Sequence, residues 1–499
     1  YGKMEAASEI IVEGGWIYNL IGGPASYENR STKNEVYINM KGGQVDYIFG
    51  GAGLSETYGN RIISVTGGQV NYSVFGGSNG SSSTNGGADG KIKGSSLIYI
   101  GGNAIIGDAN LVSSGTSIFG AEAGSVFGIG NGKSNNESIG SMKESHIIID
   151  GGAQVKRNVY GGGNYGYVGH SSFSTTLSKI DIIGGTVDGA VYGGGNNNGS
   201  GTSSISSEVQ INMTGGQVGY VYGGSRSKGT VYGSTTVNVT KGRVLHDVYG
   251  GGEGGYTDST RPGTYIRNNV SVVIGNTNAL NTDLKIDGNV YGGSAFGSVN
   301  TTNQTATTSS STTKVTVNSG VVSKSVFGGA KGDNSFTPKV VGDIEVNIKG
   351  GSIGNVFGGM DASGKPSNGD IVYLNGGVIG NAYGGGNNAS QDVTNIFLQG
   401  SAVNELFGGS NLLGTVNESN VKFTSGDVNN IYGGNNKAGS TVNTNVTVQR
   451  VTTNILGTGA ATEGIIAGDI YGGGNEAEST NSNVLIEDST VNDVYGGGN

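Results

Sequence analysis

Residues 184–196 of this chain are Gly-Gly-Thr-Val-Asp-Gly-Ala-Val-Tyr-Gly-Gly-Gly-Asn, and the end of this stretch recurs throughout the sequence. The recurring element, which we call the cassette, is a hydrophobic residue, an aromatic residue and at least two glycines. Its aromatic residues are Phe49, Phe75, Tyr160, Tyr192, Tyr222, Tyr249, Tyr291, Phe327, Phe357, Tyr383, Phe407, Tyr432, Tyr471 and Tyr495. Where no long insertion intervenes, successive aromatics lie 24 to 30 residues apart. Repeats of this length are typical of solenoids, propellers and arrays.

Each repeat carries two strand signals. The first alternates apolar and polar residues, as in 36–40, 209–213 and 344–348, and this period of two predicts a half-buried β-strand. A glycine pair follows, which favours a sharp turn because glycine adopts positive φ freely. The second strand is short and ends at the cassette, as in 45–49. Asn or Asp often precedes its last apolar pair and predicts a bend there, at Asn158, Asp247, Asn289, Asn355, Asn381, Asn430, Asp469 and Asp493.

These signals predict an all-β fold, because no segment of useful length has a helical period. We expect one continuous parallel β-solenoid domain over residues 1–499, with about 15–16 coils and 24–30 residues in a minimal coil. This count includes degenerate cassettes at Ile21-Gly22-Gly23 and at Phe119 or Phe127. Insertions rich in Ser, Thr, Asn and Gly should place loops on one edge, at 78–95, 128–143, 197–206, 252–267, 296–313, 330–340 and 361–369. Since both termini fall inside the repeat, we expect a fragment or a processed part of a longer chain.

Composition excludes several classes of protein. The chain has 100 glycines in 499 residues without a Gly-X-Y period, and only four prolines, so collagen and polyproline structures are excluded. It has no cysteine, and therefore neither disulfides nor thiolate metal sites. The net charge of −9 disfavours a nucleic-acid partner. The sequence contains no run of about 18 apolar residues, which is the length that a membrane-spanning segment needs. An acidic surface rich in Asn, Ser and Thr favours an extracellular or cell-surface location.

The aromatic column has two interpretations. The first is a structural ladder in which rings of successive coils stack and set the coil register, each pair adding about 0.5–1.5 kcal/mol beyond the burial of area. The second is an exposed stripe that binds glycan rings. The exchange of Phe and Tyr along the column argues against a specific role for the hydroxyl. The sequence leaves open whether the rings face the core or the solvent.

Asparagines after the glycines form a second candidate column, made of Asn164, Asn196, Asn387, Asn435 and Asn475, with Asn499 at the end of the chain. We expect these amides to form a stacked ladder or a turn. Phosphate binding by the glycines is disfavoured, since a phosphate loop needs a helix N-terminus behind it. No cofactor is expected. No metal site is expected. Asp469 and Asp493 occupy one column in neighbouring coils and are the candidates considered for a cation, but outward solvation of the two carboxylates is favoured.

The run Gly-Gly-x-Val-x-x-Val-Tyr-Gly-Gly-Gly-Asn, present at 184–196 with one extra residue, resembles repeats in large cell-surface and secreted proteins of bacteria, many of them gut Firmicutes. The resemblance covers nearly the whole chain. It implies a β-solenoid stalk, an adhesin or a matrix component. It implies no catalytic residues.

Three functions are therefore considered. The first is an extracellular structural protein, a fibre subunit or surface stalk whose coils stack axially on another copy or on a continuation of the same chain. The second is an adhesin that binds glycans or host surface proteins through the insertion-bearing edge. The third is a polysaccharide-active enzyme, which needs clustered carboxylates. Acids are scattered here, and His146, His170 and His246 lie far apart in the sequence, so we expect no enzymatic activity.

Overall fold

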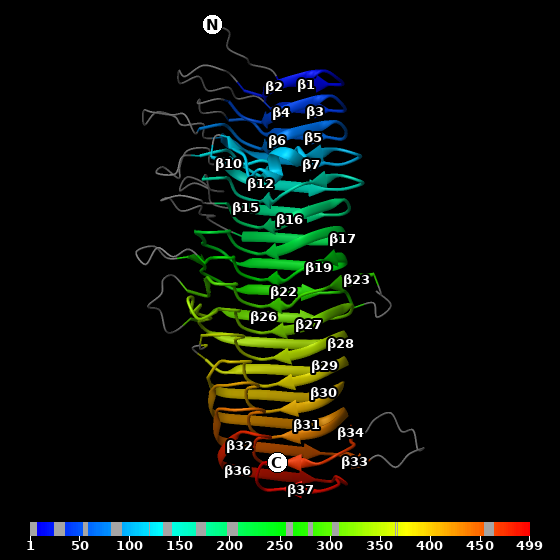
Figure 1. The fold of residues 1–499 in the computed structure, drawn as a ribbon, viewed down its shortest axis with the longest axis vertical. Coiled ribbons are helices and arrows are strands. Elements are labelled where there is room, and N and C mark those ends of the chain that lie inside the picture. Colours follow the sequence, from blue (N-terminus) through cyan, green and yellow to red (C-terminus); the bar gives the residue numbers. More distant parts are fainter. Residues whose placement is uncertain are drawn as a thin grey trace. The chain divides into compact units, whose positions relative to one another are not determined.

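Parallel strands from successive repeats lie beside one another in the computed structural model of this chain (Figure 1). The structure describes residues 7–23, 35–52, 58–80, 92–118, 120–132, 142–165, 176–196, 208–255, 263–277, 283–301, 309–364, 366, 368–453 and 464–499. The chain divides into two compact units, Tyr1–Leu245 with Gly251–Arg267, and His246–Gly250 with Asn268–Asn499. Each unit is treated separately below.

The first unit contains one short helix among its strands. Its elements are β1 (Ser8–Val12), β2 (Trp16–Ile21), β3 (Val36–Met40), β4 (Gln44–Phe49), β5 (Arg61–Val65), β6 (Gln69–Phe75), β7 (Ile92–Ile100), β8 (Ile105–Ile106), α1 (Ala109–Ser113), β9 (Ser117–Ile118), β10 (Ala121–Glu122), β11 (Val126–Phe127), β12 (Met142–Ile149), β13 (Gln154–Val155), β14 (Val159–Tyr160), β15 (Leu177–Ile182), β16 (Thr186–Tyr192), β17 (Glu208–Tyr222), β18 (Gly229–Val231), β19 (Thr235–Val244) and β21 (Thr264–Ile266).

The second unit consists of strands joined by turns. They are β20 (Val248–Tyr249), β22 (Val270–Ile274), β23 (Leu284–Ile286), β24 (Val290–Tyr291), β25 (Ser298–Val299), β26 (Thr312–Val317), β27 (Val321–Phe327), β28 (Asp343–Phe357), β29 (Asp370–Tyr383), β30 (Gln391–Phe407), β31 (Thr415–Tyr432), β32 (Ser440–Gln449), β33 (Val451–Thr453), β34 (Gly464–Ile466), β35 (Ile470–Tyr471), β36 (Glu478–Glu487) and β37 (Val494–Tyr495).

Parallel pairing in register builds columns of like residues, and the predicted all-β parallel solenoid is confirmed. We call one repeat of this stack a rung. In the first unit one buried column joins Ile38, Ile63, Ile98, Ile147, Ile180, Ile211 and Val237. In the second unit an equivalent column joins Val272, Val315, Val346, Val372, Ile396, Val421 and Val446. Each inward side chain is covered by the next rung, so burial of apolar area is shared between neighbours.

The predicted glycine turn and the predicted bend both have a clear geometry. The second glycine of the pair has positive φ, 82° at Gly43, 72° at Gly216 and 91° at Gly351. We call the alternating strand of each rung its first arm and the short strand that ends at the cassette its second arm. Several strands, such as β17 and β28, continue through the glycine turn from the first arm into the second. At the bend the pairing register shifts, for example between Val187 and Ala190. The shift is a bulge, which re-aims the short strand that ends at the cassette.

Helix α1 is the element that the sequence analysis missed. The Asp108 side chain caps it by accepting hydrogen bonds from the backbone N–H groups of Asn110 and Leu111, at 2.9 and 3.3 Å. The helix lies in an insertion between β8 and β11 and is too short to show a helical period. Phe127, after this insertion, takes the aromatic position of its rung, whereas Phe119 lies outside the described residues.

The predicted insertions are described to different extents. Segment 330–340 is fully described, and Val340 in it bridges in parallel with Val299. Segment 252–267 is described in part, and its strand β21 pairs in parallel with β18. Segment 197–206 lies outside the described residues, as do parts of 78–95, 128–143, 296–313 and 361–369. Some insertions therefore add short strands to the stack.

Candidate functional site

Each unit contains a continuous stack of cassette aromatics. In the first unit the rings of Phe49, Phe75, Phe127, Tyr160, Tyr192 and Tyr222 stack face to face, with centroids 4.7–5.0 Å apart. In the second unit the stack joins Tyr249, Tyr291, Phe327, Phe357, Tyr383, Phe407, Tyr432, Tyr471 and Tyr495, with centroids 4.6–5.0 Å apart. This spacing is the separation of hydrogen-bonded strands, so the rungs themselves set the ring distance.

Burial decides how these rings can be used. From Phe49 to Tyr432 no ring residue of the two stacks is more than 6 % exposed, whereas Tyr495 is 43 % exposed. Both faces of an interior ring are covered by its neighbours, so they cannot stack on a sugar. The rings therefore contribute packing and rung register.

Amides four residues after nine of the stacked aromatics form the second column. In the first unit Asn196 donates to Asn164, Asn164 to Asn131 and Asn131 to Asn79, at 3.0–3.2 Å. In the second unit Asn499, Asn475, Asn436, Asn411 and Asn387 each donate to the preceding side chain, ending at Asp361, at 2.8–3.0 Å. Each amide has both a donor and an acceptor, so the chain of hydrogen bonds can repeat with every rung.

Asn435 is not a member of this column. Asn436 makes the hydrogen bonds to Asn411 and Asn475, whereas the buried Asn435 donates to the backbone carbonyl of Gly414 at 2.9 Å. The predicted set followed the first Asn after the glycines. After Tyr432 only two glycines precede the first Asn, so Asn435 lies three residues after the aromatic. The column requires a spacing of four residues, which Asn436 has.

The bend column supplies acceptors for backbone N–H groups of the next rung. Asn158 accepts from the N–H of Ala190 at 2.8 Å, Asp247 from Asn289 at 2.8 Å and Asn430 from Asp469 at 2.8 Å. These side-chain oxygens replace ladder acceptors that the bulge displaces, which explains the preference for Asn and Asp.

Asp469 and Asp493, the candidates for a metal site, belong to this bend column. The N–H of Asp493 donates to Asp469 Oδ1 at 3.3 Å, and the hydroxyl of Tyr471 donates to Asp469 Oδ2 at 3.4 Å. The described residues contain no group of three or more His, Asp or Glu side chains placed to hold a metal ion. The hydroxyl of Tyr495 likewise donates to Asp493 Oδ2 at 3.5 Å, so both carboxylates have partners within the rung geometry.

A further ladder of hydroxyl groups was missed by the sequence analysis. Ser145, Ser178, Thr394 and Ser419 lie two residues before the buried column of Ile147, Ile180, Ile396 and Val421. Each donates to the carbonyl of a glycine that follows a cassette aromatic, at 2.5–2.7 Å. A buried Ser or Thr at the start of an alternating strand was the available signal. These bonds tie the two arms of the solenoid together across the core.

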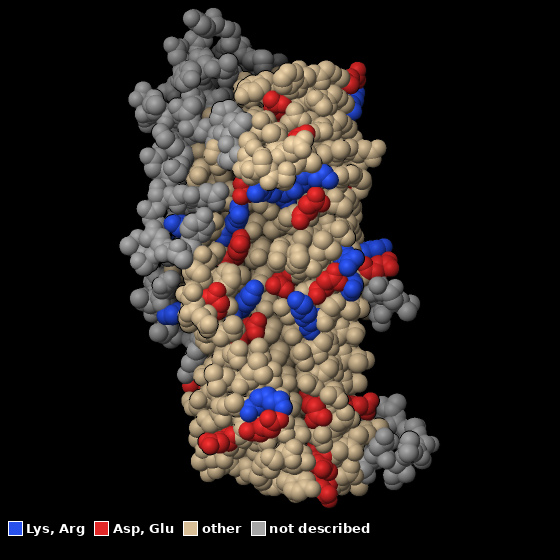
Figure 2. All heavy atoms as spheres, viewed as in Figure 1, with Lys and Arg blue, Asp and Glu red and all other residues tan. Residues whose placement is uncertain are grey.

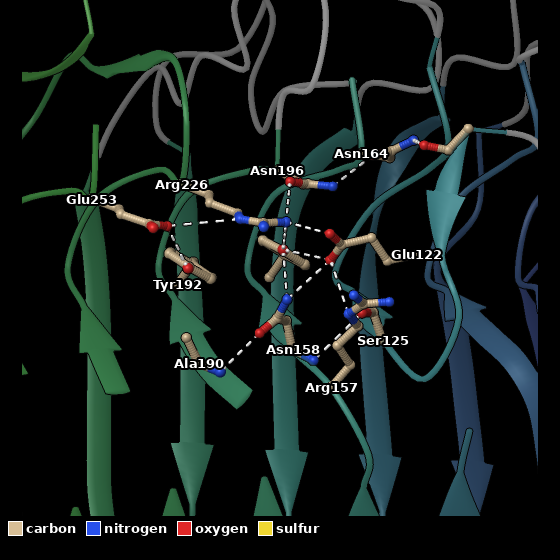
Figure 3. A network of polar contacts seen from close by, with 12 residues as sticks. Glu122, Ser125, Arg157, Asn158, Asn164, Ala190, Tyr192, Asn196, Arg226 and Glu253 are labelled. Atoms are coloured by element: carbon tan, nitrogen blue, oxygen red, sulfur yellow. Dashed lines mark hydrogen bonds and ion pairs between the residues drawn. The ribbon is translucent and has the colours of Figure 1, made fainter. Parts of the chain in front are cut away.

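A polar cluster that joins several rungs lies in the first unit (Figure 3). Glu122 on β10 accepts from Asn158 Nδ2 at 3.0 Å and from the Tyr160 hydroxyl at 3.2 Å, and it forms an ion pair with Arg226. Arg226 also donates to Asn196 Oδ1 at 3.3 Å, and its Nε lies 3.7 Å from Glu253 Oε2. The cluster thereby joins side chains of several rungs and extends the amide column with charges.

Opposing effects set the ionisation of this cluster. Burial raises the pKa of Glu122, but Arg226, Arg157 and the Asn158 amide outweigh it and hold that pKa below its usual value. Burial raises the pKa of Glu253, and the Tyr192 hydroxyl and Arg226 only partly offset this. Arg226 thus stabilises the negative charge of Glu122 more than that of Glu253. An ion pair of this kind stabilises one specific arrangement of the rungs, because either charge alone would be buried without compensation.

One histidine takes part in a compact surface group. His146 Nε2 lies 2.6 Å from Asp181 Oδ2, and Lys179 Nζ lies 2.8 Å from the same oxygen. Asn212 donates to Asp181 Oδ1 at 2.8 Å. Burial raises the pKa of Asp181, while the hydrogen bonds from Asn212, Lys179 and His146 outweigh it and lower that pKa. Both oxygens of Asp181 are thus saturated with donors. His170 lies outside the described residues.

Surface charge is sparse and mixed in sign. Figure 2 shows Lys and Arg side chains beside Asp and Glu on the face that it displays, with uncharged residues between them. Among the described residues, no helix has the length and apolar character that a membrane crossing requires.

Comparisons with the models of protein families, with curated proteins and with solved structures found no match to this chain. The candidate site is therefore interpreted from its geometry alone. That geometry consists of ladders of side chains that repeat from rung to rung.

Proposed function

We propose that this chain is an extracellular structural protein, a fibre subunit or surface stalk in which rungs stack axially. The observation that carries the proposal is the continuity of the ladders. Apolar, aromatic, amide and hydroxyl columns each connect one rung to the next within a unit, so that every rung provides the template for another. Stability of such a stack comes from contacts between neighbours and permits growth in one direction.

The outermost rungs of this sequence expose apolar side chains that a further rung, from another copy or from a continuation of the same chain, would contact. On β36 and β37 Leu485, Val494 and Tyr495 are 45 %, 42 % and 43 % exposed. On β1 and β2 Ile11, Trp16 and Tyr18 are 51 %, 70 % and 57 % exposed. Apolar side chains at strand edges favour the addition of another strand. A further parallel rung beyond β37 would cover Val494 as Ile431 and Ile470 are covered, because these residues precede it in one fully buried column. Leu485, Ile11 and Trp16 lie in outward columns, whose interior members Thr447, Asn39 and Gln44 stay partly exposed.

The test replaces Val494 by Lys and measures assembly of the purified chain by sedimentation velocity and negative-stain electron microscopy. In a single chain the ammonium group stays hydrated, but a rung placed over it would bury an unpaired charge, at several kcal/mol. The wild type should form elongated assemblies as its concentration rises, and Val494→Lys should remain a single chain with the same circular dichroism spectrum.

The matched control is Leu412→Lys, since Leu412 is 46 % exposed but lies on an interior rung. This variant should assemble like the wild type. Axial stacking would be refuted by a wild type that stays a single chain at all concentrations, or by equal assembly of both variants.

The alternative function is an adhesin, and one surface feature favours it. A shallow hollow on the second unit is lined by Val378, Ala402, Asn404, Asp427 and Asn429, among others. Asn429 donates to Asn404 at 2.7 Å and Asn404 to Asn381 at 3.1 Å, which leaves a row of oriented amides beside apolar groups. Amides and small apolar surfaces suit the hydroxyl and C–H groups of a glycan.

The adhesin hypothesis predicts retention of specific oligosaccharides on a glycan array. Ala402→Arg fills the hollow and should reduce this binding at least tenfold, whereas Ser352→Arg, in the same outward column but outside the hollow, should leave it unchanged. If the wild type retains no glycan, or if both variants bind equally well, the hollow is not an adhesive site.

A further inference from the structure

Asp370 and Gln391 form an isolated polar pair in the core of the second unit. Asp370 begins β29 and lies in the inward column in which the following rungs carry Thr394 and Ser419. Those two residues are hydroxyl donors to glycine carbonyls. Gln391 begins β30, and its counterpart in the next rung is Val416. The pair therefore interrupts columns of hydroxyl and apolar residues.

Both side chains are fully enclosed. Asp370 is 0 % exposed and Gln391 is 1 % exposed. The amide Nε2 of Gln391 donates to Asp370 Oδ2. The other two oxygens, Asp370 Oδ1 and Gln391 Oε1, have no hydrogen-bond partner among the described residues. Two buried acceptors without a donor are an expensive arrangement, about 1–3 kcal/mol for each group.

Among the described residues, no counter-charge balances Asp370. The charged groups on the elements packed around it are Asp343, Glu345 and Lys349 on β28, Asp361 on the segment after β28, and Asp392 and Glu405 on β30. The acids among them have partners of their own. For example, Asp343 accepts from Asn368 at 2.8 Å and Asp392 from Asn417 at 2.8 Å. Lys349 is the only lysine or arginine among these groups, and it is not among the causes that shift the pKa of Asp370.

We propose that Asp370 is a neutral carboxylic acid which donates its proton from Oδ1 to Gln391 Oε1, closing a two-bond acid–amide ring that locks this rung and opens when the proton is lost. One proton satisfies both orphaned oxygens, since a protonated carboxyl is a donor and a carboxylate is not. The result is a pH-sensitive contact inside the stack, independent of whether the stack is a stalk or an adhesin.

The direction of the pH dependence follows from burial. Burial raises the pKa of Asp370 well above its usual value, and the hydrogen bond from Gln391 only partly opposes this. The folded state then binds the proton more tightly than the unfolded state. The stabilisation is complete below the unfolded pKa, about 3.9, and is lost as the pH rises through the folded pKa. Between these values the equilibrium constant for the closed state falls up to tenfold for each pH unit.

Infrared spectroscopy of the wild-type chain tests the protonation state directly. A protonated carboxyl has a C=O stretch at higher frequency than any carboxylate, and at neutral pH the exposed acids do not contribute to it. The wild type minus Asp370→Asn difference spectrum should show this band at pH 7. Its absence from the wild type at pH 7 would overturn the proposal, and this outcome does not depend on any variant.

Hydrogen exchange measured by mass spectrometry tests the lock. Asp370→Asn replaces the acid–amide ring by an amide–amide ring that needs no proton. The ratio of exchange rates, wild type over Asp370→Asn, in peptides from 370–407 should rise with pH, by up to tenfold per unit. Asp343→Asn, which alters an exposed acid of β28, should show the wild-type exchange rates at each pH. A ratio that is constant with pH would overturn the proposal.

Discussion

Gly408→Ala is expected to unfold much of the second unit, while the same change at Gly496 leaves the fold intact. Gly408 directly follows the aromatic of its cassette, and its N–H donates to the carbonyl of Tyr432 at 2.8 Å. A Cβ on Gly408 would collide with the backbone carbonyl of Gly433 in the next rung and with the Ser419 side chain. A backbone carbonyl in a ladder cannot move aside, so the rungs must separate. The free energy of unfolding of the second unit should fall by about 3 kcal/mol or more, measured by urea denaturation.

Gly496 is the matched control because it occupies the same cassette position on the outermost rung of the second unit. A Cβ there would meet no atom of the described residues within 4 Å. Gly496→Ala should therefore unfold at the wild-type urea concentration. If Gly408→Ala were equally stable, the close approach of rungs in the structure would be incorrect.

Phe357→Ala should produce a loss of comparable size through a different mechanism. Phe357 is 3 % exposed, and its ring lies between those of Phe327 and Tyr383, at 4.6 and 4.7 Å. Truncation removes both stacking contacts and leaves a cavity that two hydrogen-bonded strands hold open. A buried Phe→Ala change destabilises by about 3–5 kcal/mol, and the two lost ring contacts place this variant toward the upper end of that range. Thermal and urea unfolding followed by circular dichroism measure the loss.

Phe357→Tyr is the control, because tyrosine occupies this position in Tyr383 and Tyr432. Its hydroxyl would extend toward the polar side of the stack, where Tyr291 donates to Asp361 at 2.8 Å. We expect a change below about 1 kcal/mol. A small effect of Phe357→Ala would show that the ring stack contributes little to rung register.

The repeat itself could be predicted because its physical requirements are local. Alternation over 36–40 requires a half-buried strand, and β3 has buried Val36, Ile38 and Met40. The glycine pair at 42–43 requires a turn, and Gly43 has positive φ. By contrast, α1 depends on a single cap at Asp108 and on packing within an insertion, and neither leaves a periodic pattern.

The composition of the candidate site depended on which rungs become neighbours. Glu122 and Arg226 lie far apart in the sequence, and only the stacking of the first unit brings them into one ion pair. The exchange of Asn435 for Asn436 in the amide column has the same origin, since the column is defined by alignment of rungs in space. Likewise, Ser and Thr residues become a hydroxyl ladder only once the second arm folds back over the first.

By itself, the sequence determined the class of fold, the glycine-pair turns and the inward residues of the alternating strands, because alternation and glycine placement act within a few neighbouring residues. Only the tertiary structure decided which side chains share a column and which rings are covered. It also decided that Asp370 is enclosed with Gln391 and, among the residues that the structure describes, without a counter-charge. These outcomes depend on contacts between rungs, and the energy of a buried polar group is set by the neighbours that enclose it.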